Sequence, residues 1–142
     1  MNSMLQTDNH KIIKCLDKDE FGKVAAEYFL NVFKYTEKPK IILPSGNTPL
    51  PLYKNIRENH SNLDFTYLQL DEYMGLPQTS EKLFSAWLAR EILDPLEIPH
   101  SQRIFFNSAA DDSHSEIQKM RNWYVEKGPA DLAILGIGKR HQ

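Results

Sequence analysis

Apolar residues follow two patterns along the chain, short continuous runs and longer stretches with helical spacing. Continuous runs predict buried strands, and spacing at every third or fourth residue predicts amphipathic helices. Because the two alternate, the sequence predicts an α/β protein with a parallel sheet and flanking helices. The expected strands are 12–16, 40–43 ("KIIL"), 65–70 ("FTYLQL"), 103–106 ("RIFF") and 131–138 ("DLAILGIG"). The expected helices follow residue 17 or 19 and cover 49–59, about 80–93, and 113 to about 128.

Three of the expected helices begin at residues that favour helix N-termini. Side-chain oxygens of Asp, Ser and Thr can accept a hydrogen bond from the first free backbone N–H groups of a helix, and proline is tolerated in the first turn. The signals are Asp17 or Asp19 for the first helix, Thr48 followed by Pro49 for the second, and Ser113 with Glu116 at capping-box spacing for the last.

Length and composition indicate one ordinary globular domain, spanning residues 1–142. The net charge is −2, and Lys and Arg are scattered, so we expect no nucleic-acid partner. No run approaches the length of a membrane helix, and the N-terminus lacks an apolar secretory segment, so we expect a cytoplasmic protein that does not bind membranes. The single cysteine, Cys15, fits a reducing compartment, and we expect it to be a small core residue.

The stretch "LPSGNTP" is the first candidate for chemistry. Ser45, Gly46, Asn47 and Thr48 follow a predicted strand and precede a predicted helix. Backbone N–H groups and hydroxyls at the positive end of a helix suit a phosphate group. The alternative is a plain tight turn in which Asn47 is left-handed and Thr48 only caps the helix.

The second candidate is "QLDEYMG", in which Asp71 and Glu72 follow the next predicted strand. Two acids after a strand also occur in ordinary solvated turns. However, parallel neighbours would bring both loops to the same edge of the sheet, where a bound phosphate could place a substrate carbon near a carboxylate base. Gly136 and Gly138 form a lone G-x-G, which is too short to indicate a dinucleotide site.

The order of these motifs resembles the glucosamine-6-phosphate deaminase (isomerase) family, which shares its fold with 6-phosphogluconolactonases. The likeness runs from about residue 11 to residue 139. It rests on "FGKVAAEYF", "LPSGNTPLPLYK", "LDEYMGLP", "LDPLEIP" and "DLAILGIG". The "DEY" triplet is similar to the deaminase branch.

The resemblance implies a Rossmann-like fold and an aldose–ketose isomerisation coupled to loss of ammonia. Ser45, Gly46, Asn47 and Thr48 would hold the sugar phosphate. Asp71 would be the general base that moves a proton from C2 of the opened amino sugar to C1, with an unshifted or lowered pKa. Glu72, Gly136 and Gly138 are secondary candidates. The small-molecule ligand is then an amino-sugar phosphate, and no metal or organic cofactor is implied.

Two departures from the family change the expectation. The segment after "GLP" reads "QTSEKLFSAWL", where the family often has a Ser-Tyr pair. After Gly138, Arg140 stands at the position of an acid, His141 at a glycine and Gln142 at a histidine. The acid and histidine assist ring opening in the family, a further glutamate orients the histidine, and the family continues through a second half. We therefore expect an N-terminal portion of the domain that is inactive by itself.

Two other functions stay open, a 6-phosphogluconolactonase-like hydrolase and a non-catalytic phosphosugar-binding module. A lactonase would need the same histidine. Because residues 131–138 are almost entirely apolar, a missing neighbour would leave an apolar edge uncovered. We accordingly expect marginal stability or self-association through that surface.

Overall fold

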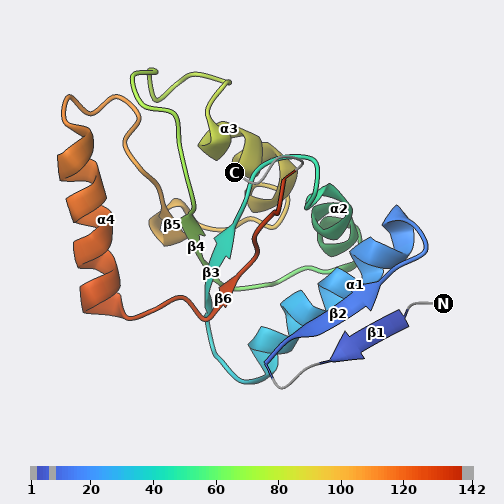
Figure 1. Cartoon of the computed structure of the whole chain (residues 1–142). Coiled ribbons are helices and arrows are strands. Elements are labelled where there is room, and N and C mark those ends of the chain that lie inside the picture. The colour runs from blue at the N-terminus through green and yellow to red at the C-terminus, as the bar shows by residue number, and fades with distance from the viewer. Residues whose placement is uncertain (1–2, 7–8, 139–142) are drawn as a thin grey trace.

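A computed structural model describes residues 3–6 and 9–138 of the chain, and Figure 1 shows the arrangement of its elements. In chain order these are β1 (Ser3–Gln6), β2 (Lys11–Lys14), α1 (Lys18–Asn31), η1 (Val32–Lys34), β3 (Lys40–Leu43), α2 (Leu50–Asn59), β4 (Thr66–Gln69), α3 (Phe84–Leu88), the π-helical turn η2 (Ala89–Leu93), η3 (His100–Gln102), β5 (Arg103–Ile104), α4 (Ser113–Lys127) and β6 (Leu132–Ala133).

The main sheet is parallel and has the strand order β5-β4-β3-β6 (Figure 1). In the central pair, Lys40 lies opposite Thr66 and Leu43 opposite Gln69. The predicted α/β architecture with a parallel, Rossmann-like sheet and flanking helices is confirmed. The runs 40–43 and 65–70 form its two central strands, as expected for strands that are apolar on both faces.

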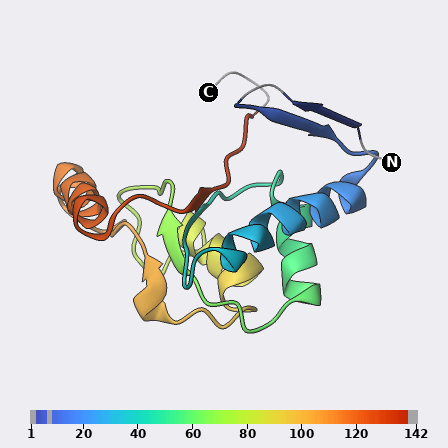
Figure 2. The same ribbon diagram turned by 90° about the horizontal axis from the view of Figure 1, so that it is seen from below.

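The principal core lies between the sheet and the helices α1 and α2. Ile41, Leu43, Tyr67 and Phe65 are fully buried there. Phe65 packs edge-on against Phe29 of α1, with 5.9 Å between ring centroids. Helix α4 lies beside the β4–β5 end of the sheet, away from α1 and α2 (Figure 2).

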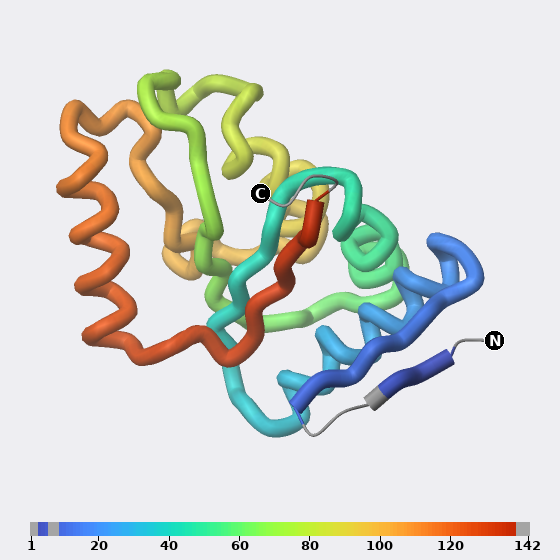
Figure 3. Tube along the Cα trace, viewed as in Figure 1, coloured from blue at the N-terminus to red at the C-terminus, as the bar shows by residue number. Residues whose placement is uncertain are grey.

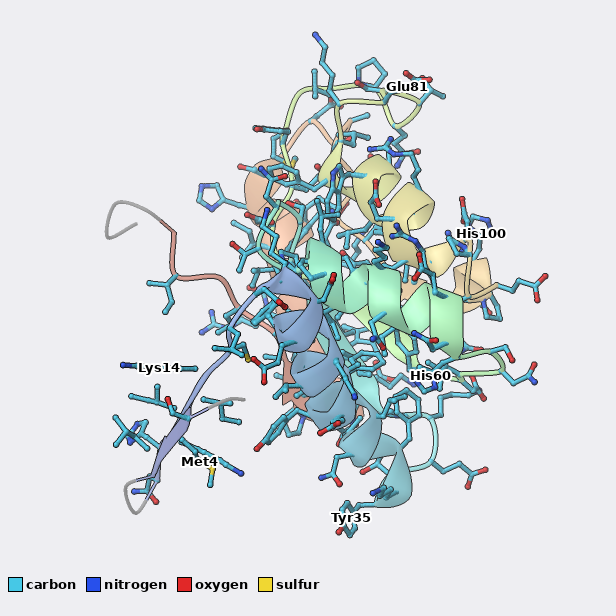
Figure 4. All side chains as sticks on the ribbon, turned by 90° about the vertical axis from the view of Figure 1, so that its right-hand side faces the viewer. Met4, Lys14, Tyr35, His60, Glu81 and His100 are labelled. Carbon is cyan, nitrogen blue, oxygen red and sulfur yellow. The ribbon has the colours of Figure 1, made fainter. Side chains whose placement is uncertain are left out.

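Residues 12–16 do not join the main sheet. β2 pairs antiparallel with β1, in the register Ser3 to Lys14, and the two form a separate two-stranded sheet. Figure 4 shows this hairpin, which carries Met4 and Lys14, standing apart from the helices. Cys15 is accordingly half-buried, and its expected place in the core is wrong.

Several predicted boundaries also change, each for a local reason. The helix expected from residue 80 begins at Phe84, because Leu83 is extended and a hydrogen bond from its N–H to the Ser80 carbonyl closes a turn instead. The last strand is only two residues long, and among the described residues it pairs with β3 alone. Asp17 caps α1 as expected, by accepting a hydrogen bond from the Glu20 N–H. Asp112, rather than Ser113, caps α4 by accepting from the His114 N–H.

Helices α1 and α2 cross at Gly22, where the backbones approach closely. A Cβ atom added at Gly22 would lie 2.5 Å from the Pro51 carbonyl oxygen of α2, well inside van der Waals contact. The obstacle is backbone, which cannot rotate away. Glycine is therefore required at this crossing, and its absent side chain sets the separation of the two helices.

Gly22→Ala should destabilise the protein by about 1–3 kcal/mol, because the added methyl group forces α1 away from α2. Helix propensity alone would make the variant more stable than wild type, since alanine is favoured over glycine in a helix by about 1 kcal/mol. Chemical denaturation measures the difference. Lys23→Ala, at the neighbouring exposed position, is the control and should change stability little. A Gly22→Ala protein more stable than wild type would contradict the close crossing.

Candidate functional site

The two candidate loops leave the sheet side by side. Leu43 pairs with Gln69, so Ser45 and Asp71, each two residues further along, emerge at the same level of adjacent strands. A cleft of about 690 Å³ opens at this edge. Of the predicted site residues, Ser45, Thr48, Asp71, Gly136 and Gly138 line the cleft, whereas Gly46, Asn47 and Glu72 do not.

The loop 44–49 is held at its start by a core residue of the following helix. The buried Tyr53 hydroxyl donates a hydrogen bond of 2.5 Å to the Pro44 carbonyl. Gly46 has a φ of 106°, a left-handed conformation that favours glycine. The turn residue with positive φ is thus Gly46 and not Asn47. Together these features fix the path of the loop before α2 begins.

Thr48 does not cap α2, contrary to the sequence prediction. Pro49 occupies the cap position, with no capping hydrogen bond from a side chain, and α2 begins at Leu50. Thr48 is exposed and lines the cleft, and its hydroxyl makes no hydrogen bond within the described structure.

Glu72 is engaged in holding the loop after β4. Its carboxylate accepts hydrogen bonds from the N–H groups of Phe84 and Ser85, at 2.9 and 3.0 Å, and from the Gln69 amide at 2.8 Å. Burial pushes the pKa of Glu72 up, but the hydrogen bonds from Ser85, Gln69 and Phe84 outweigh it, so the pKa lies below its ordinary value. Glu72 thus acts as an ionised anchor for the start of α3.

Gln69 connects this anchor to the neighbouring strand. It is 3% exposed, and its amide oxygen accepts a hydrogen bond of 2.8 Å from the Phe106 N–H after β5. The same side chain donates to Glu72. Gln69 is not among the residues predicted from the sequence, although a polar residue at the end of an apolar strand is a signal that could have indicated it.

Asp71 differs from Glu72 in its hydrogen bonding and in the direction of its pKa shift. Its carboxylate accepts no hydrogen bond within the part of the chain that the structure describes, and it faces the cleft. Burial, with a smaller contribution from the charge of Glu72, raises the pKa of Asp71. This direction is opposite to the unshifted or lowered pKa expected from the sequence. A raised pKa makes the carboxylate a stronger base.

The rest of the cleft is largely apolar. Among the described residues that line it, Lys11 and Asp71 are the only charged ones. In the described ranges, no group of three or more His, Cys, Asp or Glu side chains could hold a metal ion, and no helix is both long and apolar enough to cross a membrane. Arg140, His141 and Gln142 lie outside the described residues.

The sheet topology and the cleft at its carboxyl edge define an α/β protein of the Rossmann-like class. A solved structure of a monomeric glucosamine-6-phosphate deaminase is similar, with a TM-score of 0.80 and 25% identity over 87% of this chain and 54% of that one. 6-Phosphogluconolactonase from Plasmodium vivax has a TM-score of 0.77 and 19% identity, over 96% of this chain and 51% of that one, which establishes the fold alone.

The sequence is also similar to the glucosamine-6-phosphate deaminase of Geobacillus sp. (strain WCH70), with 29% identity over 136 residues. That match covers 91% of this chain and 53% of the relative. No family model matches the chain. The predicted resemblance to the glucosamine-6-phosphate deaminase family is confirmed, and the chain spans about half the length of the curated relatives it matches.

Glu72→Gln should lower stability by about 1 kcal/mol at neutral pH, because the amide replaces a charged acceptor at the start of α3. Partial exposure of the site keeps the effect this small. The folded-state pKa is lowered, so the wild-type advantage is fully present above the ordinary pKa of 4.5 and is lost as the pH falls through the folded-state value. Denaturant titrations of both proteins from pH 7 to pH 3 measure the difference in their free energy of unfolding. Glu81→Gln, in the same loop, is the control. A difference independent of pH would contradict the role of the charge.

The pKa of Asp71 should fall part of the way to its ordinary value of 3.8 in the Glu72→Gln variant. The repulsive charge of Glu72 is removed, whereas burial, the larger cause, remains. Carboxyl-carbon NMR titration of both proteins measures the shift. An Asp71 pKa that is below 3.8 in the wild-type protein would be inconsistent with the geometry.

Proposed function

We propose that the cleft binds an amino-sugar phosphate and that Asp71 is the general base of a glucosamine-6-phosphate deaminase-type site. The proposal is carried by one observation. Thr48 and Asp71 line the same cleft from the loops that follow two adjacent strands, and neither the Thr48 hydroxyl nor the Asp71 carboxylate makes a hydrogen bond within the described structure.

The phosphate would bind at the loop 45–48, before α2. Helix α2 is ten residues long, and its N-terminus carries partial positive charge. Backbone N–H groups of the loop, with the hydroxyls of Ser45 and Thr48, supply neutral donors for phosphate oxygens. The open backbone at Gly46, where a Cβ atom would meet nothing within 4 Å, leaves room for a ligand to approach.

Asp71 would act on the opened form of the sugar. It takes the proton from C2, the C2–H electron pair forms the C1–C2 double bond of an enolamine, and the carbonyl oxygen at C1 takes up a proton. Asp71 then returns its proton to C1, which leaves an imine at C2. Water adds to that imine and ammonia leaves, so the products are fructose 6-phosphate and ammonia. A base with a raised pKa suits the first step.

The different environments of Asp71 and Glu72 support Asp71 as the general base. Glu72 accepts hydrogen bonds from two backbone N–H groups at the start of α3 and from the Gln69 amide, whereas the Asp71 carboxylate accepts none in the described structure and is partly desolvated. Pairs of titratable groups whose environments push their pKa values apart are typical of acid–base sites. The sequence relatives support a deaminase substrate over a lactone, because the lactonases are similar at 18–19% identity only.

The 142-residue polypeptide should bind glucosamine 6-phosphate with a millimolar or lower Kd and turn it over little or not at all. Low turnover is expected because Arg140 and Gln142 stand where the resemblance places the ring-opening acid and histidine. Thr48→Ala should weaken binding about tenfold, through loss of a hydrogen bond to a charged group. Calorimetry measures binding, and assays for ammonia and fructose 6-phosphate measure turnover.

Two controls separate the roles. Thr36→Ala, in the loop at the other end of β3, should leave the affinity unchanged. Asp71→Asn should keep the affinity within about threefold but abolish any turnover that the wild-type chain has. Absence of binding heat with glucosamine 6-phosphate, or tighter binding of a 6-phosphogluconate lactone or its product, would contradict the proposal.

A further inference from the structure

The loop that follows β4 and carries Asp71 lies against the loop that follows β5. Figure 3 shows the two segments, in green and orange, side by side beyond the carboxyl edge of the sheet. Two hydrogen bonds join them, from the Gly75 N–H to the Ser108 carbonyl at 2.8 Å and from the Gln78 amide to the Asn107 amide oxygen at 2.7 Å. None of these four residues lines the cleft. The loop is therefore held by groups outside the cleft.

Gln69 adds a third connection at the base of the same loop, and its amide has only one satisfactory orientation. The side chain is buried and hydrogen-bonded at both ends. The Phe106 N–H can only donate, so it must face the amide oxygen of Gln69. The NH₂ group is then turned toward Glu72, and it too can only donate. Glu72 must therefore present an acceptor, which an ionised carboxylate does with both oxygens.

Glu72 is thereby committed to the start of α3. Its Oε2 atom accepts from the Gln69 amide and the Ser85 N–H, and its Oε1 atom accepts from the N–H groups of Phe84 and Tyr73. A carboxylate has about four acceptor sites, so these four donors occupy all of them. Turning Glu72 toward the cleft would leave the donors unpaired, which is costly where they are partly buried.

We propose that Gln69 is a positioning residue for the Asp71 carboxylate, because its fixed amide holds Glu72 against α3 and so leaves Asp71 as the acid that faces the cleft. Gln69 does not itself line the cleft, and it acts through Glu72 and the backbone between them. The inference rests on the proposed function only in taking Asp71 as the base.

The connection also has an electrostatic consequence. The Gln69 amide helps to keep the pKa of Glu72 low, and the charge of Glu72 adds to burial in raising the pKa of Asp71. Without the amide, less of Glu72 would be ionised where Asp71 titrates, and a loosened loop would let water reach Asp71. Both changes lower the pKa of Asp71. Tyr67, which lies near both acids, is buried with a pKa well above its ordinary value, so it stays neutral in this range. Lys11 lines the cleft and is unchanged throughout.

Gln69→Met tests the proposal, because methionine is also long and unbranched but lacks the amide donor and acceptor. Carboxyl-carbon NMR titration should give a higher pKa for Glu72 and a lower pKa for Asp71 than in the wild-type protein. Hydrogen exchange at the Phe84 and Ser85 N–H groups, measured at one pH, should accelerate about tenfold, because their acceptor is held less firmly. A pKa of Asp71 that is unchanged within experimental error would contradict the proposal.

Gln102→Met is the matched control, at the opposite edge of the sheet. The Gln102 amide also makes two hydrogen bonds, each of 2.8 Å, to the Asp64 carboxylate and to the Phe65 carbonyl before β4. Its loss should lower stability and leave the pKa of Asp71 unchanged. An equal shift of that pKa in the Gln69 and Gln102 variants would overturn the proposal, because general loosening of the sheet would then explain it.

Gln69→Glu separates the two hydrogen bonds, and it provides a second test if Gln69→Met does not fold, which circular dichroism checks. At neutral pH the new carboxylate still accepts from the Phe106 N–H, but it cannot donate to Glu72 and repels it. Exchange at the Phe106 N–H should stay slow, whereas exchange at Phe84 and Ser85 should accelerate. Unchanged exchange at Phe84 and Ser85 would show that Gln69 does not hold Glu72 in place.

These measurements contain no sugar phosphate, so they are independent of the proposed function. If the wild-type chain binds no glucosamine 6-phosphate but Gln69→Met lowers the pKa of Asp71, the proposed function is wrong and the positioning role of Gln69 stands. If the chain binds glucosamine 6-phosphate and the pKa of Asp71 does not respond to Gln69→Met, the positioning role is wrong and the binding site stands.

Discussion

The parallel pairing of β3 with β4 is the constraint on which the candidate site depends. Its register brings the ends of both strands to one level, so Ser45 and Asp71 emerge next to each other although they are far apart in the chain. The pairing is fixed because Ile41, Leu43, Tyr67 and related side chains are buried against α1 and α2. A shift by one residue would turn these side chains to the opposite face. Core packing therefore determines the geometry of the site.

Adjacent acids acquire different properties from this geometry. Glu72 points toward the start of α3, where backbone N–H groups and Gln69 keep it ionised. Asp71 points toward the cleft, where burial and the neighbouring charge make ionisation less favourable. The anchored carboxylate thus both holds the loop and contributes to the basicity of the free one. The lowered pKa of Glu72 and the raised pKa of Asp71 are not properties of the Asp-Glu dipeptide itself. Both arise from the groups that surround it in the folded protein.

The central strands and both loops could be predicted from the sequence, because a strand buried on both faces leaves a continuous apolar run such as "KIIL". The hairpin of β1 and β2 could not be predicted, because the apolar pattern of a strand does not determine which other strand it pairs with. Capping at Thr48 was predicted from residue type, but Pro49 occupies the cap position and α2 begins at Leu50, which depends on the path of the whole loop. The direction of the Asp71 pKa required knowledge of burial, which depends on the packed fold.

The candidate site lies in a cleft that is otherwise largely apolar, and this affects its chemistry. Asp71 and Thr48 line the cleft together with Phe21, Val24 and Tyr28 of α1. A ligand that filled the cleft would exclude water from the Asp71 carboxylate. Desolvation is already the main cause of the raised pKa of Asp71, so the same change would raise it further and strengthen the base. Ligand binding and the increase in the basicity of Asp71 would then be one event.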